Sequence, residues 1–149
     1  MEADTLPSDF KEFLQLLNAE GVEYLLIGGY AVGYHGYPRY TADIDVWVAR
    51  QQDNAERVVR ALSKFGFSAP ENVPALFLQE RSVVRMGVPP MRIEITSHID
   101  GVQFAECYAR RVVAEIDGVQ VNVISREDLK TNKRAVGRLK DLADLENLP

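Results

Sequence analysis

The sequence predicts a single-domain α/β (α+β) fold in which helices pack on one mixed β-sheet. Its 149 residues, taken as one domain over 1–149, match the length of an ordinary globular domain. Short runs rich in Val, Ile and Leu alternate with longer stretches whose apolar residues recur at helical spacing. The chain has 46% hydrophobic and 26% charged residues, a globular composition, and no apolar run reaches the ~20 residues of a transmembrane helix.

The first half of the chain alternates helices and strands around one glycine pair. Phe10, Phe13, Leu14 and Leu17 form an apolar stripe at helical spacing, whereas the run before Gly28-Gly29 is short and continuously apolar. In chain order we expect a helix from the N-cap Ser8 to Gly21, a strand at 23–27, a short helix at 30–35, a strand at 43–49 and a helix at 54–65 that ends at Gly66.

Turn and capping signals organise the second half. Asp117-Gly118 is a strong two-residue hairpin signal, and Ser125 with Asp128 resembles a capping box with Asp in place of Glu. Segment 73–78 fits either a helix or a strand, and Gly137 is a candidate break in the last helix. In chain order we expect strands at 83–86 and 92–96, a helix at 104–110, strands at 111–116 and 119–124, and helix from Ser125 onward.

Cysteine content and the N-terminus indicate a cytoplasmic protein without a membrane partner. Cys107 is the only cysteine, which excludes a disulfide within the chain and a zinc site with several cysteines. Residues 1–9 carry three acidic residues and no basic one, so the basic n-region and the apolar h-region of a secretory signal are both missing.

The net charge of −5 is unevenly distributed. The stretch 126–140 contains six basic and two acidic residues, a local charge of +4, which leaves −9 for the rest of the chain. The overall sign argues against a protein that coats nucleic acid, whereas a basic stretch on an acidic protein indicates a local site for an anion. A solvated helix face explains this composition equally well.

The segment that carries chemistry is Asp43-Ile44-Asp45, on an expected strand. Since strand side chains alternate, both aspartates point to one face and repel each other, and no packing requirement places them there. Glu94 repeats the pattern on a later strand and joins the aspartates if the two strands are neighbours. Three carboxylates can hold two Mg²⁺ ions ~3.5–4 Å apart, with Mn²⁺ as an alternative, for in-line phosphoryl or nucleotidyl transfer. Taken alone, an Asp-x-Asp pair more often decorates a solvent-facing strand.

The glycine pair changes the interpretation of these carboxylates. Gly28-Gly29 lies between a strand and a short helix, where bare backbone N–H groups form an anion site. Phosphate-binding glycines and metal-binding carboxylates on adjacent elements are complementary parts of one nucleotide site. We therefore expect Gly28 and Gly29 to contact the phosphate of a bound nucleotide.

Three stretches carry a resemblance that spans nearly the whole chain: LIGGYA at 26–31, RYTADIDV at 39–46 and RIEI at 92–95. They resemble the nucleotidyltransferase superfamily typified by DNA polymerase beta, whose signature is a glycine pair, an Asp-x-Asp strand and a third acidic residue on a later strand. With KDLADL at 140–145, the chain is similar to small bacterial members, namely the lincosamide-type antibiotic nucleotidyltransferases and the toxin-type relatives of abortive-infection systems.

The resemblance implies a minimal nucleotidyltransferase fold and a defined reaction. A hydroxyl acceptor attacks the α-phosphate of a nucleoside triphosphate, and pyrophosphate leaves. Asp43 and Asp45 hold both Mg²⁺ ions, Glu94 binds the ion on the nucleophile side, and Gly28 and Gly29 donate backbone N–H groups to the triphosphate.

Two positions depart from the superfamily signature. Gly29 stands where many members have Ser, so a hydroxyl contact to phosphate is missing. The third acidic residue is Glu94 instead of the commoner Asp, and Asp100 is its alternative. The resemblance leaves the acceptor open among a small molecule, a tRNA and a protein, and an antitoxin or a second copy of the chain is an expected partner.

Four further residues are candidates for triphosphate binding. Arg39 and Thr41 alternate just before Asp43, and Arg39 pairs either with phosphate or with that aspartate. On a continuous C-terminal helix, Lys133 and Lys140 share the apolar, inward stripe, where a lysine must reach solvent or find an anion. We therefore predict that both lysines contact the triphosphate, an assignment that fails if the helix breaks. An ion pair with a nearby carboxylate is the alternative.

Two other functions share these sequence features. A phosphatase of the haloacid-dehalogenase type also uses Asp-x-Asp, with the first Asp as the nucleophile after an apolar strand. Here the run before Asp43 is Pro-Arg-Tyr-Thr-Ala, which does not match that pattern. The non-enzymatic alternative is a degenerate domain that binds a nucleotide or a partner protein.

Overall fold

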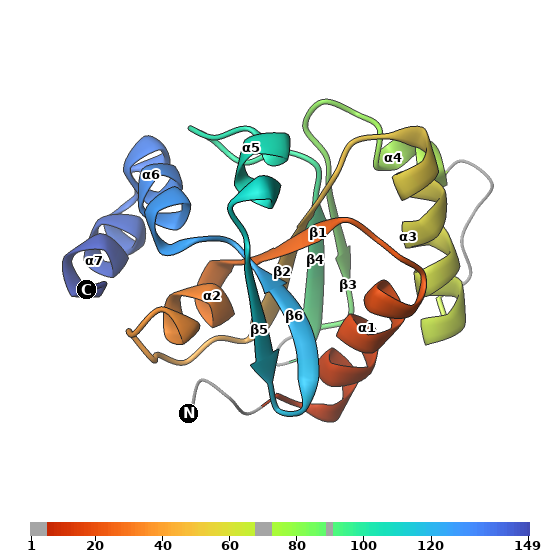
Figure 1. Cartoon of the computed structure of the whole chain (residues 1–149), viewed down its shortest axis with the longest axis horizontal. Coiled ribbons are helices and arrows are strands. Elements are labelled where there is room, and N and C mark those ends of the chain that lie inside the picture. Colours follow the sequence, from red (N-terminus) through yellow and green to blue (C-terminus); the bar gives the residue numbers. More distant parts are fainter. Residues whose placement is uncertain (1–5, 68–72, 89–90) are drawn as a thin grey trace.

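The chain forms a six-stranded mixed β-sheet with helices on both sides (Figure 1). The computed structural model describes residues 6–67, 73–88 and 91–149. In chain order the elements are α1 (Ser8–Ala19), β1 (Tyr24–Ile27), α2 (Gly28–Tyr34), β2 (Asp43–Val48), α3 (Gln52–Phe65), α4 (Val73–Leu76), β3 (Val83–Met86), β4 (Arg92–Thr96), α5 (Phe104–Ala109), β5 (Val112–Ile116), β6 (Val119–Val123), α6 (Arg126–Val136) and α7 (Leu139–Asn147). The predicted fold class, one mixed sheet with helices packed on it, is confirmed.

The order of the strands across the sheet is β3-β4-β2-β1-β6-β5. The strand β2 lies antiparallel to β1 and parallel to β4, so the two strands with candidate carboxylates are neighbours. Their register places Asp45 opposite Ile27 on one side and Glu94 on the other. The sheet therefore brings the end of β1 and two carboxylates to one place.

The core lies between the sheet and the helices α1 and α3 (Figure 1). Ile44, Val46 and Val48 of β2 are completely buried. They belong to one apolar cluster with the stripe of α1, which consists of Phe10, Phe13, Leu14 and Leu17. Because strand side chains alternate, Asp43 and Asp45 point to the opposite face, on the side of α2, α6 and α7.

Most predicted elements are confirmed, with differences at their ends. The N-cap prediction for Ser8 is wrong, because Ser8 is the first helical residue and Pro7 precedes it. The helix α2 begins at Gly28 instead of residue 30, because a φ of +70° at this glycine turns the chain from the end of β1 directly into the helix. The helix α3 likewise begins at Gln52, two residues before the predicted start.

The C-terminal region contains two helices instead of one. Ser125 caps α6 as predicted, and its Oγ accepts from the backbone N–H of Asp128 at 3.1 Å. The second contact of the predicted capping box, from the Asp128 carboxylate back to the N-cap, is wrong, because that carboxylate pairs with Arg110 at 2.9 and 3.0 Å. Gly137 adopts a φ of +69° and ends α6, so the helix breaks at the residue that the sequence analysis named as a candidate break.

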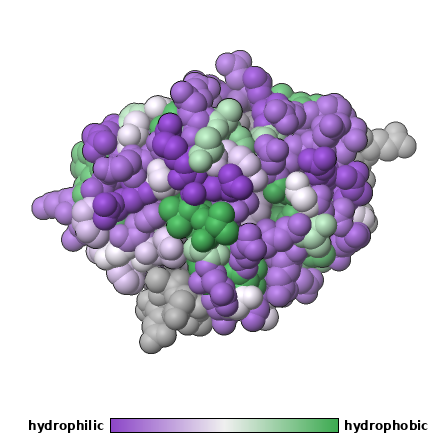
Figure 2. Space-filling view, viewed as in Figure 1, coloured by the Kyte–Doolittle hydropathy of each residue, from purple (hydrophilic) through white to green (hydrophobic). Residues whose placement is uncertain are grey.

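The surface is mainly hydrophilic in the view of Figure 1, with small hydrophobic groups near its centre (Figure 2). Large hydrophobic side chains that are exposed lie on several different elements, including Val83 of β3, Val113 of β5 and Leu139 of α7. Within the described ranges, no helix combines the length and the apolar character that crossing a membrane requires.

Candidate active site

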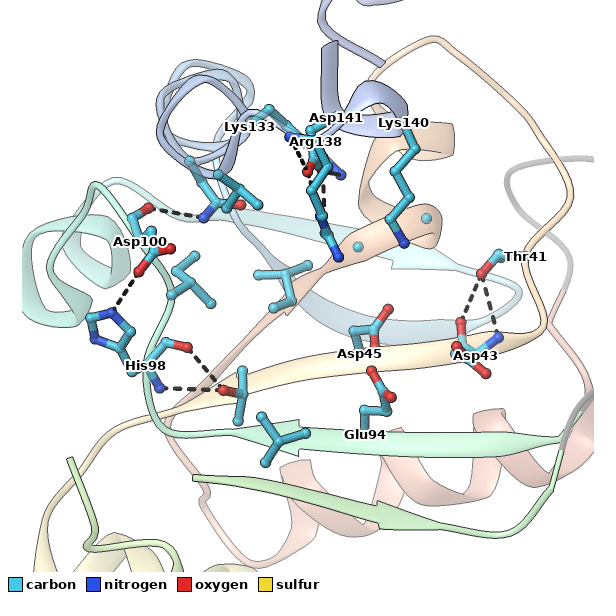
Figure 3. A pocket seen from close by; sticks show the side chains of 18 of the residues that line it. Thr41, Asp43, Asp45, Glu94, His98, Asp100, Lys133, Arg138, Lys140 and Asp141 are labelled. Carbon is cyan, nitrogen blue, oxygen red and sulfur yellow. Dashed lines mark hydrogen bonds and ion pairs between the residues drawn. The ribbon is translucent and has the colours of Figure 1, made fainter. Parts of the chain in front are cut away.

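A cavity of about 500 Å³ lies on the polar face of the sheet, below α6 and α7 (Figure 3). All site residues predicted from the sequence line it. They are Gly28, Gly29, Arg39, Thr41, Asp43, Asp45, Glu94, Lys133 and Lys140, together with the alternative Asp100. The fold therefore collects residues from six separate segments of the chain around one space.

Asp45 and Glu94 form a pair of carboxyl groups at the floor of this cavity. They lie opposite each other on β2 and β4, within hydrogen-bonding reach. Burial, the hydrogen bond with Glu94 and the neighbouring negative charges raise the pKa of Asp45 far above that of a free aspartate. Burial opposes ionisation of Glu94 too, but the hydrogen bond from Asp45 and the Arg85 guanidinium lower its pKa. Two carboxyl groups this close favour a single negative charge between them, and a cation can take the place of the proton that this requires.

Two arginines that the sequence analysis did not identify balance the other carboxylate charges. Arg92 donates from Nε and Nη2 to the two carboxylate oxygens of Asp43, each at 3.0 Å. Arg85 Nε donates to Glu94 Oε1 at 2.6 Å. Strand alternation was a usable signal for Arg92, which shares a face with Glu94, whereas Arg85 depends on the β3–β4 register. Side chains of the same protein therefore balance part of the acidic charge.

The oxygen-only donor set fits a hard divalent cation such as Mg²⁺ after one side-chain movement. Asp45 and Glu94 already face each other across the neighbouring strands β2 and β4. Asp43 is held by Arg92 and has to turn away from it to become a third ligand. As the side chains stand, no group of three or more acidic, histidine or cysteine residues in the described part of the chain is placed to hold a metal ion.

Both glycines of the pair lie directly against polar side chains of the site. A Cβ atom on Gly28 would overlap the carboxylate of Asp45, and one on Gly29 would stand 2.7 Å from Cβ of Thr41. Thr41 Oγ1 in turn donates to the carbonyl oxygen of Asp43 at 3.0 Å and fixes the start of β2. Because the two glycines have no side chains, β2 and the segment that precedes it can lie close to the first turn of α2.

The two candidate lysines have different environments because Gly137 separates their helices. Lys133 on α6 is only 6% exposed, and its Nζ lies 3.1 Å from Oδ1 of Asp141 and 3.0 Å from Oδ2 of Asp144. The premise that a continuous helix turns Lys133 toward the triphosphate is wrong, and the alternative of an ion pair applies to it. Lys140 on α7 is exposed and projects into the cavity toward Asp45 (Figure 3).

Arg39 belongs to the same ion network as Lys133. Its Nε and Nη2 donate to Oδ1 and Oδ2 of Asp144 at 2.8 and 2.9 Å. The alternative of a pair between Arg39 and Asp43 is wrong, since another arginine holds that carboxylate. Arg138 completes the network, with its Nε 2.7 Å from Oδ2 of Asp141. The network therefore ties the segment before β2 to both C-terminal helices.

A second polar group lies at the end of the cavity beyond β4 (Figure 3). His98 Nε2 and Asp100 Oδ1 are 3.0 Å apart, and Arg81 lies 3.7 Å from the same carboxylate oxygen. Asn132 of α6 donates to the carbonyl oxygen of Asp100 at 2.9 Å and closes this end. Glu94, and not Asp100, is therefore the carboxylate that lies beside the Asp-x-Asp strand.

A strand followed by a glycine pair, an Asp-x-Asp strand beside it and a carboxylate on the next strand define the fold and the candidate site of a nucleotidyltransferase. The chain belongs to the family described as "Nucleotidyltransferase of unknown function (DUF6036)", which matches residues 4–148. Family and fold confirm the resemblance to the nucleotidyltransferase superfamily and remove the haloacid-dehalogenase alternative.

Among solved structures, a candidate nucleotidyltransferase from Thermotoga maritima (TM1012) is similar in fold. The two structures have a TM-score of 0.61, and the likeness covers 92% of this chain and 88% of the other. The sequences are 17% identical, so the likeness concerns the fold alone. No curated protein matches the chain.

Proposed function

We propose that the protein transfers a nucleoside monophosphate from a nucleoside triphosphate to a hydroxyl acceptor, with release of pyrophosphate and dependence on Mg²⁺. One observation carries the proposal: Asp45 and Glu94 lie side by side in a cavity that Asp43, Gly28 and Lys140 also line. Oxygen ligands for a cation and a cationic side chain for phosphate thus meet in one space. Its volume of about 500 Å³ is within the range of small-molecule sites.

The triphosphate is expected on the side of the cavity next to β1 and α7. Lys140 projects there as a positive charge close to Asp45, where it can contact a phosphate oxygen. Gly28 and Gly29 are the first two residues of α2, and the N–H groups of a first helical turn have no partner within their helix. Both N–H groups can therefore donate to the same phosphates.

The three carboxylates are expected to bind the cation and to handle the acceptor's proton. Two Mg²⁺ ions, or Mn²⁺ in their place, held by Asp43, Asp45 and Glu94 would polarise the α-phosphate and neutralise charge on the leaving pyrophosphate. Glu94 is expected to accept the hydroxyl proton of the acceptor, because its carboxylate lies beside Asp45 in the cavity, within reach of a group bound there.

Lys133 and Arg39 are assigned a supporting role. A direct contact of Lys133 with phosphate would separate it from Asp141 and Asp144, two carboxylates that are 1% and 2% exposed. Uncovering buried charges in this way costs several kcal/mol, on the order of 3–5. We infer that both cations hold α6 and α7 in place and so position Lys140.

Labelled nucleoside triphosphates test the proposed reaction. The protein is incubated with each α-labelled triphosphate, Mg²⁺ and a cell extract, and label is followed into RNA, protein and small molecules. Transfer by the wild type that is lost with Asp45→Asn and in the presence of EDTA supports the proposal. The labelled product also identifies the acceptor class and the preferred base. Label that enters no fraction with any triphosphate contradicts the proposal.

A degenerate domain that binds a nucleotide without catalysis is the second candidate, and one observation favours it. Arg92 and Arg85 occupy two of the three carboxylates, so the resting side chains do not form a ready metal site. Calorimetric titration with a non-hydrolysable triphosphate, read beside the transfer assay, separates the two functions, because a degenerate domain binds the analogue but transfers no label from the natural triphosphates. Native mass spectrometry of the purified protein tests the expected antitoxin or second-copy partner.

A further inference from the structure

A second hollow, of about 340 Å³, lies away from the candidate active site. Its walls come from the end of α1 and the turn that follows it, from β6, and from the end of α5 with the residue that leads to β5. None of the described residues that line it also lines the cavity over β2 and β4. Its volume lies at the lower end of the range for small-molecule sites. The chain therefore offers a second place where a small ligand fits.

Arg111 is the one charged side chain among the described residues that line this hollow. Its Nη1 donates to the carbonyl oxygen of Tyr108 at 2.9 Å, whereas its Nε is buried and has no hydrogen-bond partner in the described part of the chain. Its neighbour Arg110 is bound to Asp128 at 2.9 Å, but no ion pair in the described ranges includes Arg111. A buried donor without a partner is costly, and an anion that accepts from Nε removes that cost.

A stack of aromatic rings holds the Arg111 guanidinium in position. Its central carbon lies 4.0 Å from the centroid of the Tyr108 ring, which stacks on Phe104 at 5.4 Å. Phe104 in turn meets the buried ring of Trp47 edge-on, at 5.1 Å between centroids. The contact with the ring and the bond to the backbone carbonyl therefore fix the guanidinium before any ligand arrives. A donor that is positioned in advance loses little conformational entropy on binding.

Amide side chains on β6 add neutral donors to the hollow. Gln120 and Asn122 are two residues apart on this strand, so both point to the same face of the sheet. Each amide can donate two hydrogen bonds and accept others. Asn18 forms part of the wall, where its amide donates to the carbonyl oxygen of Gln120 at 2.6 Å and accepts from Tyr24 Oη at 3.0 Å. Glu115, which pairs with Gln120 in the register of β5 and β6, is exposed and does not line the hollow.

The composition of this lining selects an anionic and polar ligand. No carboxylate among the described residues lines the hollow to hold a cation, and Val22 is the one aliphatic side chain in the described lining. An apolar ligand would therefore bury little surface there. The Nε edge of a guanidinium matches two oxygens of a phosphate or a carboxylate in a planar fork. The amides suit the remaining oxygens or neighbouring hydroxyl groups.

We propose that Arg111, Gln120 and Asn122 bind the phosphate or carboxylate group of a small polar molecule, at a site separate from the nucleotide cavity. The guanidinium donates from Nε and Nη2 to two oxygens of that group, and the amides donate to the others or to hydroxyl groups beside it. The ligand is bound without any change in its covalent bonds. Because the net charge of −5 repels anions in general, these directed donors must retain the ligand. The site does not depend on the proposed nucleotidyl transfer, since it shares no lining residue with that cavity.

NMR spectra of the arginine Nε–H groups in ¹⁵N-labelled protein test the site directly. Inorganic phosphate, acetate and ribose 5-phosphate are titrated separately, against NaCl at matched ionic strength. We expect the Arg111 Nε–H signal, which is assigned by its absence in Arg111→Lys, to shift until it saturates, with a dissociation constant on the order of 1 mM. The matched control lies in the same spectrum. The Nε of Arg110 already donates to Asp128 at 3.0 Å, so its signal should hardly move.

The side-chain amide signals of Gln120 and Asn122 report the same site independently of the guanidinium. They should shift together with the Arg111 signal. In Arg111→Lys the dissociation constant read from them should rise about five- to tenfold, because lysine keeps the charge but lacks the fork. Saturation by inorganic phosphate identifies a phosphorylated ligand and saturation by acetate a carboxylate, and either supports the proposal. Tighter binding of ribose 5-phosphate than of inorganic phosphate adds a role for hydroxyl groups.

Lys140→Ala separates this site from the candidate active site, where phosphate can bind as well. The Arg111 shift should persist in this variant, and the backbone signals of the same spectra show that each variant is folded. An Arg111 signal that moves no more with the anions than with NaCl overturns the proposal, as does a shift that disappears in Lys140→Ala. Amide shifts that are equally strong in Arg111→Lys and in the wild type also contradict it, because the fork would then not hold the anion.

Discussion

At the scale of single residues, Gly28 is the position where the backbone lies most tightly against a candidate catalytic side chain, that of Asp45. Its φ of +70° lies in the left-handed region, and a Cβ atom there would overlap the carboxylate of Asp45. Gly21 has nearly the same φ, +71°, but no described atom of a more distant residue lies within 4 Å of its Cβ position. The two glycines therefore separate the cost of the backbone conformation from the cost of crowding the site.

We predict that Gly28→Ala destabilises the protein more than Gly21→Ala does. Both substitutions force a side chain into the left-handed region, at about 1–2 kcal/mol. Gly28→Ala adds the overlap with Asp45, about 1–3 kcal/mol for an overpacked contact. Urea unfolding of the three proteins measures the difference, and Mg²⁺-nucleotide binding should be lost in Gly28→Ala alone. Equal costs would mean that Asp45 moves aside freely.

Asp45 is predicted to make the metal-free protein less stable as pH rises. Its pKa is raised in the folded state by burial and by Glu94, so between the unfolded and the folded pKa the folded protein holds a proton that the unfolded chain has released. The free energy of unfolding therefore falls with increasing pH over that interval, by about 1.4 kcal/mol for each pH unit fully inside it. Urea unfolding in EDTA between pH 5 and pH 9 should show this slope.

The same measurement on Asp45→Asn provides the control. An amide has no proton to lose and can donate to Glu94, so the slope should disappear and the variant should exceed the wild type in stability at the alkaline end. Glu94→Gln removes the other half of the pair and should act in the same direction. A slope that persists in both variants would assign the pH dependence to other groups.

At the scale of elements, the ion network of Arg39, Lys133, Asp141, Asp144 and Arg138 explains why α6 and α7 stay together across Gly137. Lys133 stands at its centre and contacts both aspartates. Burial alone would raise the pKa of each aspartate, but their cationic partners lower it below the ordinary value. The network therefore stabilises the folded state at neutral pH and loses that contribution in acid, when these carboxylates take up protons.

We predict that Lys133→Met strongly destabilises the protein, because it leaves Asp141 and Asp144 buried without their common partner. Removal of one member of a buried ion group costs about 3–5 kcal/mol. Arg134→Met, one residue away on the exposed face of α6, is the matched control and should cost less than about 0.5 kcal/mol. Thermal unfolding at pH 7 measures both. Similar costs for the two variants would show that the network contributes little to stability.

The elements themselves were predictable wherever turn chemistry is local. Between β5 and β6, Asp117-Gly118 adopts φ values of 51° and 79°, the pair of positive angles that a tight hairpin turn requires. The strands β3 and β4, elsewhere in the sheet, have the predicted bounds. The helix starts were less predictable. Ser8 has a capping side chain, but Pro7 provides the φ and the carbonyl that precede the helix. In the sequence, Gly28 marks the end of an apolar strand, but its backbone already begins α2.

At the scale of the whole molecule, the site divides into a part that local spacing encodes and a part that the tertiary fold creates. Asp43 and Asp45 share a face because of strand alternation alone, and the glycine pair marks the turn beside them. The contact between Arg39 and Asp144 joins residues 105 positions apart, and no local pattern encodes it. The prediction for Lys133 assumed one continuous helix, and Gly137 removes that premise.

The whole molecule also carries its charges unevenly, and this leads to a prediction for the bound cation. The protein has a net charge of −5, and Asp43, Asp45 and Glu94 gather negative charge on one face of the sheet, where Arg92 and Arg85 balance part of it. A divalent cation relieves the repulsion between Asp45 and Glu94 only in the folded state, so it should raise the melting temperature. Binding at 100 times the dissociation constant stabilises by about 2.7 kcal/mol, which corresponds to roughly 5–10 °C for a chain of this size.

Differential scanning fluorimetry with EDTA, with Mg²⁺ and with Mg²⁺ plus a non-hydrolysable triphosphate measures this shift. We expect an increase with Mg²⁺ that grows with the nucleotide, is larger at alkaline than at acidic pH, and is absent in Asp45→Asn. The pH dependence follows from the raised pKa of Asp45, because a cation competes with protons for this carboxylate and binds more easily where protons are scarce. NaCl at matched ionic strength is the necessary control, since salt alone screens the repulsion among surface charges. An equal shift in NaCl, or one that Asp45→Asn retains, would place the effect on the general surface and remove the carboxylate pair as the metal site.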